Sequence, residues 1–327
     1  MSKTGRAAEG VGTPLFFLMT ELSPKFKAGY VAIVGEPNVG KSTLMNTLLD
    51  QKISIVTRKP QTTRQRVLGI LSQNDAQIIF LDTPGLLKPK YLLHEKMVRS
   101  AQSALDDADV IVLMTEVDNK CELSPAVRDL VLTKYSEKPL LLVMNKVDTI
   151  YKPNLLPLID GFVKQQRFRE VIPISALKRQ NLDDFLSTLL QYLPVHEPYY
   201  PTDIVSEQPE RFFVAEFIRE QVFEQFEEEI PYSTAVEIQE FNERDAGKTY
   251  INADIIVERQ SQKGILIGKN GEALKKVGSA ARKEIEDFIQ RKVFLELYVK
   301  VRERWRENEG TLKRLGYAAG NKSSSEL

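Results

Sequence analysis

The chain has 327 residues, which is more than one typical domain holds and is enough for two. Lys and Arg together number 45, as do Asp and Glu, so a net charge of zero gives no argument for a nucleic-acid partner without a local basic surface. The single cysteine, Cys121, excludes an intrachain disulfide and favours a cytosolic compartment, and with only His94 and His196 beside it a typical zinc site is excluded.

The first 27 residues are expected to form a flexible extension. Their apolar run, Leu15 to Met19, is too short to cross a membrane and lacks the flanking features of a signal peptide. Met19 is an alternative start for the protein. No apolar stretch of the sequence reaches the roughly 20 residues that a membrane helix needs.

Alternating apolar runs and helical patterns predict an α/β domain over residues 28–194. Strands are expected at Tyr30–Val34, Gln77–Leu81, Val110–Met114, Leu140–Met144 and Val171–Ile174. Helices are expected at Leu44–Leu49, Glu95–Leu105, Pro125–Tyr135 and Leu182–Leu193. This alternation is typical of a mostly parallel sheet with helices on both faces.

The composition changes at Pro194, and residues 195–207 are expected to form a linker because prolines are frequent there. A smaller α+β domain is predicted over residues 208–305. Its helices are expected at Phe212–Phe226 and Glu272–Ile289, and its strands at Thr234–Phe241, Tyr250–Val257 and Val293–Val301. Residues 306–327 are expected to form a C-terminal tail, polar and disordered from Asn321 onward.

The first functional motif connects the first strand of the α/β domain to its first helix. The motif Gly35-Glu36-Pro37-Asn38-Val39-Gly40-Lys41-Ser42 fits the phosphate-binding loop Gly-x-x-x-x-Gly-Lys-Ser, and Thr43 follows it. The glycines let backbone N–H groups converge on phosphate oxygens, and the helix start adds the positive end of its dipole. Lys41 is expected to face the β- and γ-phosphates, and Ser42 to offer a hydroxyl to Mg²⁺.

A second motif, Asp82-Thr83-Pro84-Gly85-Leu86, follows the strand that ends at Leu81. A carboxylate at a strand end, here Asp82, can hold Mg²⁺ through water. The Gly85 N–H can contact the γ-phosphate, so this segment can sense whether that phosphate is present. Asp-x-x-Gly alone also fits an ordinary turn, but its position after a strand favours the phosphate site.

Two further segments predict the base site and a preference for guanine. Asp148, in Asn145-Lys146-Val147-Asp148, can accept hydrogen bonds from the guanine ring N–H and exocyclic amine. Adenine has no amine at that position, and a site built to bond a group rejects analogues that lack it. We expect Asn145 to brace the loops, Lys146 to cover the base, and a backbone N–H of Ser175-Ala176-Leu177 to meet the guanine oxygen.

The smaller domain contains the loop Gly268-Lys269-Asn270-Gly271 before its second predicted helix. Alone, Gly-x-x-Gly is more often a connector between helices. With a helix, two strands and a final strand around it, it predicts a KH domain, which clamps about four nucleotides of RNA backbone. Cations follow the loop, and the candidates for RNA contact are Gly268, Lys269, Asn270, Gly271, Lys275, Lys276 and Arg282. Acidic residues gather instead at Glu227–Glu229, so a neutral chain can still hold RNA on one face.

In this order, the motifs resemble those of the translation-factor-related GTPases, and within them the bacterial Era family, from about Lys27 to Tyr317. Three features carry the resemblance: Pro37-Asn38, Gln61-Thr62-Thr63-Arg64 and the loop that begins at Gly268. The extension before Lys27 is a departure from the family.

The resemblance implies a Mg²⁺-dependent GTPase with a type II KH domain. It implies that Thr63, rather than the less favoured Thr62, ligates Mg²⁺ when GTP is bound. It also implies binding near the 3′ end of small-subunit ribosomal RNA, with the 30S particle as partner, during ribosome assembly. We expect a monomer that binds GTP and GDP and does not bind DNA.

The place that holds a catalytic glutamine in many Ras-like enzymes is occupied by Leu86, which cannot orient water. In related GTPases an asparagine equivalent to Asn38 helps to hold K⁺ against the phosphates. Asn38 is therefore expected either to anchor K⁺, with carbonyls of Thr57–Thr63 around it, or to be an ordinary loop residue. The predicted catalytic residues are Lys41, Thr63, Gly85 and Asn38.

Two other functions fit parts of the sequence. A phosphate-loop ATPase or small-molecule kinase is disfavoured by Asn145–Asp148. A membrane-associated regulatory GTPase in cell-cycle control would use the KH fold as a docking module, with a peripheral contact at the inner face of the cell membrane. A cytoplasmic location is expected in the main interpretation.

Overall fold

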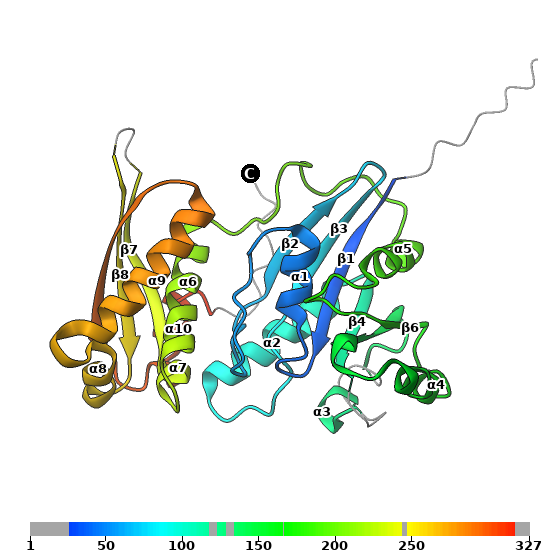
Figure 1. Ribbon diagram of the computed structural model, residues 1–327, viewed down its shortest axis with the longest axis horizontal. Coiled ribbons are helices and arrows are strands. Elements are labelled where there is room, and N and C mark those ends of the chain that lie inside the picture. Colours follow the sequence, from blue (N-terminus) through cyan, green and yellow to red (C-terminus); the bar gives the residue numbers. More distant parts are fainter. Residues whose placement is uncertain (1–25, 118–122, 129–133, 166, 244–246, 318–327) are drawn as a thin grey trace, which may run out of the picture.

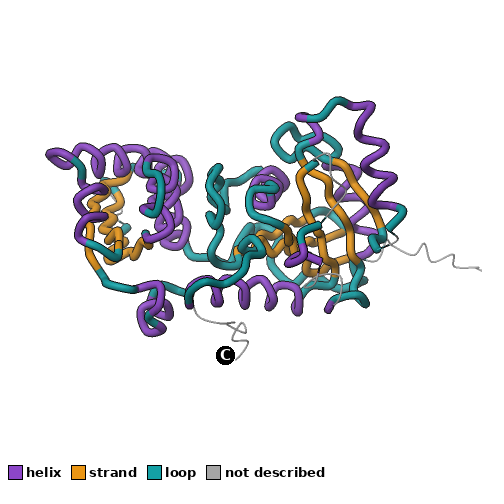
Figure 2. Tube along the Cα trace, turned by 90° about the horizontal axis from the view of Figure 1, so that it is seen from below, coloured by secondary structure: helices purple, strands orange, loops and turns teal. Residues whose placement is uncertain are grey.

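The computed structural model describes residues 26–117, 123–128, 134–165, 167–243 and 247–317 (Figure 1). Most of the expected N-terminal extension, the end of the expected tail and Cys121 lie outside these residues. Two units, each with its own sheet and helices, lie next to each other along the long axis (Figures 1 and 2). Within the described residues, no helix is long and apolar enough to cross a membrane.

The first unit is built on a six-stranded sheet in the order β2-β3-β1-β4-β5-β6. Its strands are β1 (Lys27–Gly35), β2 (Val67–Ser72), β3 (Ala76–Asp82), β4 (Val110–Glu116), β5 (Leu140–Asn145) and β6 (Glu170–Pro173). Only β2 runs antiparallel to its neighbour, and the other pairs are parallel. The predicted mostly parallel α/β fold is therefore confirmed, with one edge strand that the sequence did not predict.

Helices cover both faces of this sheet. They are α1 (Lys41–Leu49), α2 (Leu92–Asp107), α3 (Pro125–Val127), α4 (Leu155–Val163) and α5 (Leu182–Tyr192). Leu44 of α1 and Phe185 of α5 pack in the core on one face, whereas Leu105 of α2 and Phe162 of α4 pack in the core on the other. The central strands are buried on both sides, which is why their sequences are continuous apolar runs.

The strand register places the functional loops at one edge of the sheet. Ile33 of β1 lies opposite Asp82 of β3, and Glu116 of β4 lies opposite Asn145 of β5. Parallel strands end at the same edge, so the loops that follow β1, β3, β5 and β6 all meet there.

The second unit has a three-stranded sheet in the order β7-β8-β9, with β7 antiparallel and β9 parallel to β8. The strands are β7 (Ala235–Asn242), β8 (Thr249–Val257) and β9 (Val293–Val301), and the helices are α6 (Glu210–Gln225), α7 (Ile230–Ser233), α8 (Gln260–Ile267) and α9 (Glu272–Ile289). The apolar sides of α6 and α9 pack on one face of the sheet, for example through Phe217 and Ile285. The predicted KH-type order of elements is confirmed.

The residues assigned to a tail from position 306 onward are folded as far as Tyr317. A short helix, α10 (Glu309–Arg314), follows β9. Trp305, Leu312 and Tyr317 are buried in one apolar cluster with Leu93 and Met97 of α2. These few apolar side chains in a polar stretch join the end of the second unit to the first.

The expected linker, residues 195–207, is hydrogen-bonded to the first unit. Gln77 of β3 accepts hydrogen bonds from the backbone N–H groups of Tyr199 and Tyr200. Ile70 of β2 donates to the carbonyl of Val205 at 2.8 Å. The connection between the two units is therefore tied to the β2 edge of the first sheet.

Candidate nucleotide and RNA sites

The phosphate loop lies between β1 and α1, and its glycines are required by close approach. A Cβ added to Gly35 would lie 2.2 Å from the Met114 carbonyl oxygen, and one added to Gly40 would lie 2.3 Å from the Asn145 amide nitrogen. Both glycines also have a positive φ, of 153° and 102°. The loop can therefore present its N–H groups to an anion only with glycine at these two positions.

Lys41 reaches back over this loop. Its Nζ donates to the carbonyls of Gly35 at 3.2 Å and Glu36 at 2.8 Å. Burial lowers the pKa of Lys41 to about 8, although Asp82 and Glu36 act in the opposite direction. A bound polyphosphate would add negative charge beside this ammonium group and favour its charged form.

Three oxygens that suit Mg²⁺ converge next to the loop. Ser42 Oγ lies 3.0 Å from Thr63 Oγ1 and donates to Asp82 Oδ2 at 2.7 Å. Asp82 is fully buried, its Oδ1 has no hydrogen-bond partner within the described part of the chain, and burial raises the pKa of this carboxyl against the effect of Lys41. A buried carboxylate with an unused oxygen beside two hydroxyls fits a hard divalent cation.

The structure separates the two candidate threonines. Thr62 also lines the cavity described below, but its hydroxyl is engaged away from Ser42: Oγ1 donates to the Lys59 carbonyl at 2.7 Å and lies 2.7 Å from Thr57 Oγ1. Thr63 is the one that meets Ser42. Asn38 lies beside the same loop, with a positive φ of 68°, and its Nδ2 donates to the Arg58 carbonyl at 3.0 Å.

The second phosphate segment is packed closely under the loop. Thr83 Oγ1 donates to the Ile33 carbonyl at 2.9 Å, and a Cβ on Gly85 would lie 2.9 Å from the Pro37 ring. Leu86 is buried in the apolar core on the α2 face of the sheet. No side chain with a donor or acceptor therefore occupies the glutamine position of Ras-like enzymes.

The base site is tied together by one buried amide. Asn145 donates through Nδ2 to the Val39 carbonyl at 2.8 Å and accepts through Oδ1 from the Ala176 N–H at 2.9 Å. It thus joins the phosphate loop to the loop after β6. Asp148 lies at the same place, and its Oδ1 accepts from Ser175 Oγ at 2.5 Å.

These groups line one cavity of about 700 Å³. It holds residues from every motif of the first unit: Pro37, Asn38, Gly40, Lys41, Ser42, Thr43, Thr63, Gly85, Asn145, Lys146, Asp148, Ser175 and Leu177. At the rim of the cavity, Leu177 is largely exposed and Lys146 is partly exposed. Lys146 forms an ion pair there with Glu116. The volume is in the range of small-molecule sites in proteins.

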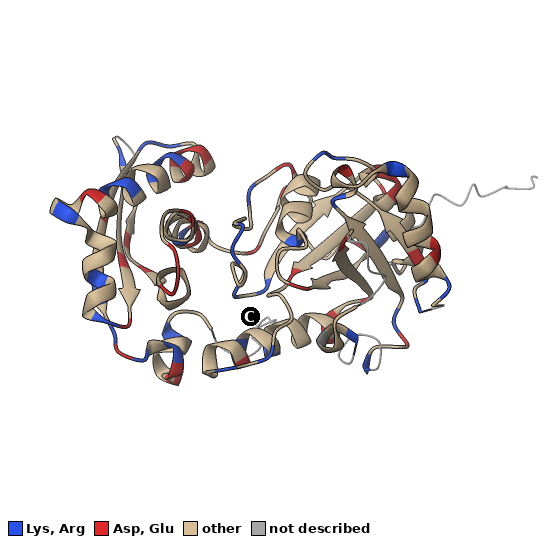
Figure 3. Cartoon of the chain, turned by 60° about the horizontal axis from the view of Figure 1, so that its bottom comes forward, with Lys and Arg blue, Asp and Glu red and all other residues tan. Residues whose placement is uncertain are grey.

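The candidate RNA site lies on the second unit and is built differently. Gly268 and Gly271 have positive φ values of 70° and 78°, and the loop they bound connects α8 to α9. Lys269 and Asn270 are exposed at its tip. The cations Lys275, Lys276 and Arg282 are exposed along α9, whose opposite side is buried, and Lys and Arg positions are coloured blue on the cartoon in Figure 3.

The sequence did not predict the contacts between the two units. Arg64 and Arg219 are both buried there, with 4 % and 1 % of their surface exposed. A signal existed for Arg219, because an arginine among Phe217, Ile218, Val222 and Phe223 places a charge on the apolar side of a helix. Arg64 belongs to the motif Gln61–Arg64, but nothing in the sequence specified its partner.

Two family models match the chain. The model described as "50S ribosome-binding GTPase" matches residues 30–146, and the model described as "KH domain" matches residues 229–306. The chain is similar to the protein "GTPase Era" of Geotalea daltonii, with 46 % identity over 302 residues, 91 % of this chain and 100 % of the relative. It is 44 % identical to "GTPase Era" of Clostridium perfringens over 294 residues, 89 % of this chain and 98 % of the relative.

Two solved structures are similar to this chain over nearly its whole length. A variant of Aquifex aeolicus Era bound to GDP and AlF₄⁻ has a TM-score of 0.86 and 45 % identity, and covers 90 % of this chain and 100 % of that one. Era in complex with MgGDPNP and nucleotides 1506–1542 of 16S ribosomal RNA has a TM-score of 0.85 and 45 % identity, and covers 90 % and 99 %.

Proposed function

We propose that this chain, which belongs to the Era family of GTPases, couples GTP hydrolysis to binding of the 3′ end of small-subunit ribosomal RNA and acts as a switch in assembly of the small ribosomal subunit. One observation carries the proposal: the chain has the same fold as a relative solved with both a GTP analogue and a fragment of 16S ribosomal RNA, at 45 % identity. The GTPase activity itself follows from the family.

The nucleotide would bind with its phosphates in the loop Gly35–Ser42 and its base at Asp148. Lys41 would place its charge between the β- and γ-phosphates, and the carboxylate of Asp148 would pair with the two guanine donors. Ser42 and Thr63 would ligate Mg²⁺ directly and Asp82 through water, and the ion would neutralise charge on the phosphates.

Hydrolysis is attack of water on the γ-phosphorus, with release of GDP and phosphate. Because Leu86 is apolar and buried, the chain must stabilise the transition state without a glutamine at that place. We propose that Asn38 supports a K⁺ ion there. Its amide nitrogen is bound to the Arg58 carbonyl, so the amide oxygen is the atom that would meet the cation.

The RNA part of the proposal is tested with the full chain and a fluorescent RNA that carries the 3′-terminal sequence of 16S ribosomal RNA. Wild type should bind it in the presence of a GTP analogue. Gly268→Asp should lose binding at least tenfold, because a side chain there would distort a loop that has a positive φ and would bring a negative charge to the phosphates. Its GTP hydrolysis should stay unchanged.

Gly310→Asp is the matched control, since Gly310 is exposed on α10 with room for a side chain. It should bind RNA as wild type does. Equal RNA binding by wild type and Gly268→Asp would contradict the proposal and favour a protein-docking role for the KH unit. A DNA strand of the same sequence should bind weakly.

A further inference from the structure

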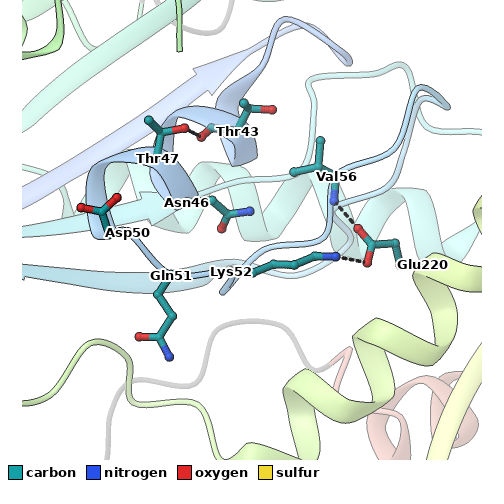
Figure 4. Close-up of a pocket in the computed structure, with 8 residues that line it drawn as sticks. All are labelled: Thr43, Asn46, Thr47, Asp50, Gln51, Lys52, Val56 and Glu220. Carbon is teal, nitrogen blue, oxygen red and sulfur yellow. Dashed lines mark hydrogen bonds and ion pairs between the residues drawn. The ribbon is translucent and has the colours of Figure 1, made fainter. Parts of the chain in front are cut away.

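The loop between α1 and β2, residues 50–66, lies against the KH unit. Figure 4 shows Glu220 of α6 reaching this segment, where its carboxylate accepts from the Val56 N–H at 2.9 Å and from Lys52 Nζ at 2.6 Å. Further along, Lys59 donates to the carbonyls of Phe223 and Phe226 at the end of α6. The cations of the loop thus meet acceptors of the KH unit.

Arg64 extends this contact after the threonine pair. Its guanidinium donates to three backbone carbonyls around α7, those of Thr234 at 2.6 Å, Pro231 at 3.0 Å and Tyr232 at 3.2 Å. It also lies over the rings of Phe223 and Trp305. A buried arginine held by carbonyls and aromatic faces fixes the end of the loop in one place.

Arg219 makes the contact that bears most directly on the reaction. Its Nη2 donates to the Thr62 carbonyl at 2.6 Å, and Glu216 holds the same guanidinium through Nε at 2.8 Å. The bonded carbonyl belongs to the peptide between Thr62 and Thr63. The next side chain along is therefore Thr63, whose Oγ1 lies 3.0 Å from Ser42 Oγ at the proposed Mg²⁺ position.

We propose that Arg219 of the KH unit is a positioning residue for GTP hydrolysis, because it fixes the Thr62–Thr63 peptide so that Thr63 stays at the metal position. A loop held only by the GTPase unit would lose more conformational entropy when it closes on the nucleotide. The KH unit removes part of that cost in advance. The inference rests on the proposed roles of Thr63 and Mg²⁺.

Linkage makes the effect reciprocal. If Arg219 favours the loop position that ligates Mg²⁺, then release of Thr63 after hydrolysis must weaken the contact between the units by the same factor. The KH unit would in this way contribute to the active site even when no RNA is bound.

The test is Arg219→Ala in the full chain. We expect the rate at saturating GTP to fall about tenfold, the loss of one charged hydrogen bond, and the Mg²⁺ concentration for half-maximal rate to rise. Affinity for GDP should not change, because GDP does not need Thr63. The double variant with Thr63→Ala should be no slower than Thr63→Ala alone, since both changes remove the same interaction.

Arg211→Ala is the matched control, because Arg211 is an exposed arginine on the same helix. It should behave as wild type. If Arg219→Ala unfolds, Lys59→Gln, a half-buried change in the same contact, should raise the Mg²⁺ requirement in the same direction.

Two results would overturn the inference: an unchanged Mg²⁺ dependence in both folded variants, or rate losses that multiply in the double variant. Failure of the proposed function is a separate result, in which wild type itself does not hydrolyse GTP or does not bind the ribosomal RNA fragment.

Discussion

The two candidate sites of this chain are built on opposite principles. In the nucleotide site, residues from several loops are hydrogen-bonded to one another, and Asn145 alone connects two of these loops. In the RNA site, one loop and one helix expose cations without fixed partners in that part of the structure. A cavity lined by interlinked polar groups selects one small molecule, whereas an exposed basic surface binds a repeated phosphate backbone. The variants below separate the two kinds of site.

Removing the phosphate-loop cation should break the first site alone. Lys41→Ala should lower the rate of GTP hydrolysis by a hundredfold or more, on the order of the loss for one transition-state donor. RNA binding by the full chain without nucleotide should be nearly unchanged. Lys152→Ala, at an exposed lysine of the same unit, should affect neither measurement. A large loss of RNA binding in Lys41→Ala would show that the sites are not separable.

The base preference should change when one carboxylate oxygen of Asp148 is replaced by an amide nitrogen. Asp148→Asn should weaken GTP binding roughly a hundredfold and improve binding of xanthosine triphosphate, because xanthine offers a carbonyl where guanine has an amine and an amide can serve it. Equilibrium titration with labelled nucleotides measures both. Asp160→Asn, at an exposed ion pair on α4, is the control. Normal GTP affinity in Asp148→Asn would make the base assignment wrong.

Replacement of K⁺ by Na⁺ should change the rate of GTP hydrolysis less than the two variants above do. Hydrolysis by wild type should be roughly tenfold faster in KCl than in NaCl at equal ionic strength, since a cation at Asn38 would stabilise transition-state charge. Asn38→Ala should lose that difference, whereas Asn154→Ala, at an exposed asparagine, should keep it. Equal rates of wild type in the two salts would leave Asn38 a structural role and would point to a protein or RNA activator.

The smallest effect should come from single cations of the RNA site. Lys275→Ala should weaken RNA binding only about threefold, because several exposed cations contribute to the binding free energy. It should reduce the slope of log affinity against log salt by about 1. Lys313→Ala on α10 should leave that slope unchanged. If Lys275→Ala lost as much RNA affinity as Gly268→Asp does, the residues of the RNA site would depend on one another as those of the nucleotide site do.

The sequence could predict that the motifs of the nucleotide site meet, because each motif is local. Each motif directly follows a recognisable strand, and parallel strands end at one edge, so their order along the chain implies their meeting in space. Leu86, which the sequence identifies as an apolar residue at the glutamine position, is buried in the structure. Residue roles in GTP binding stay predictions until the variants above are measured.

Other parts could not be predicted, for physical reasons. The strand β2 is short and contains Gly69, which weakens its strand pattern. The helix α4 contains Pro157 and Gly161, which both have low helix propensity, so tertiary packing decides its structure. The contacts of Arg64 and Arg219 depend on how two units dock, which no periodicity encodes. Nor does the sequence show that the apolar residues of the second unit continue into those of the first.

The apolar cluster around Trp305 has a consequence for the newborn chain. Leu93 and Met97 of α2 are covered only when Leu312 and Tyr317 arrive, about 220 residues later. At typical speeds of synthesis that delay is roughly 10 to 45 seconds. During this interval part of α2 in the nascent GTPase unit stays uncovered, and the two units of the protein can dock fully only after Tyr317 has been synthesised.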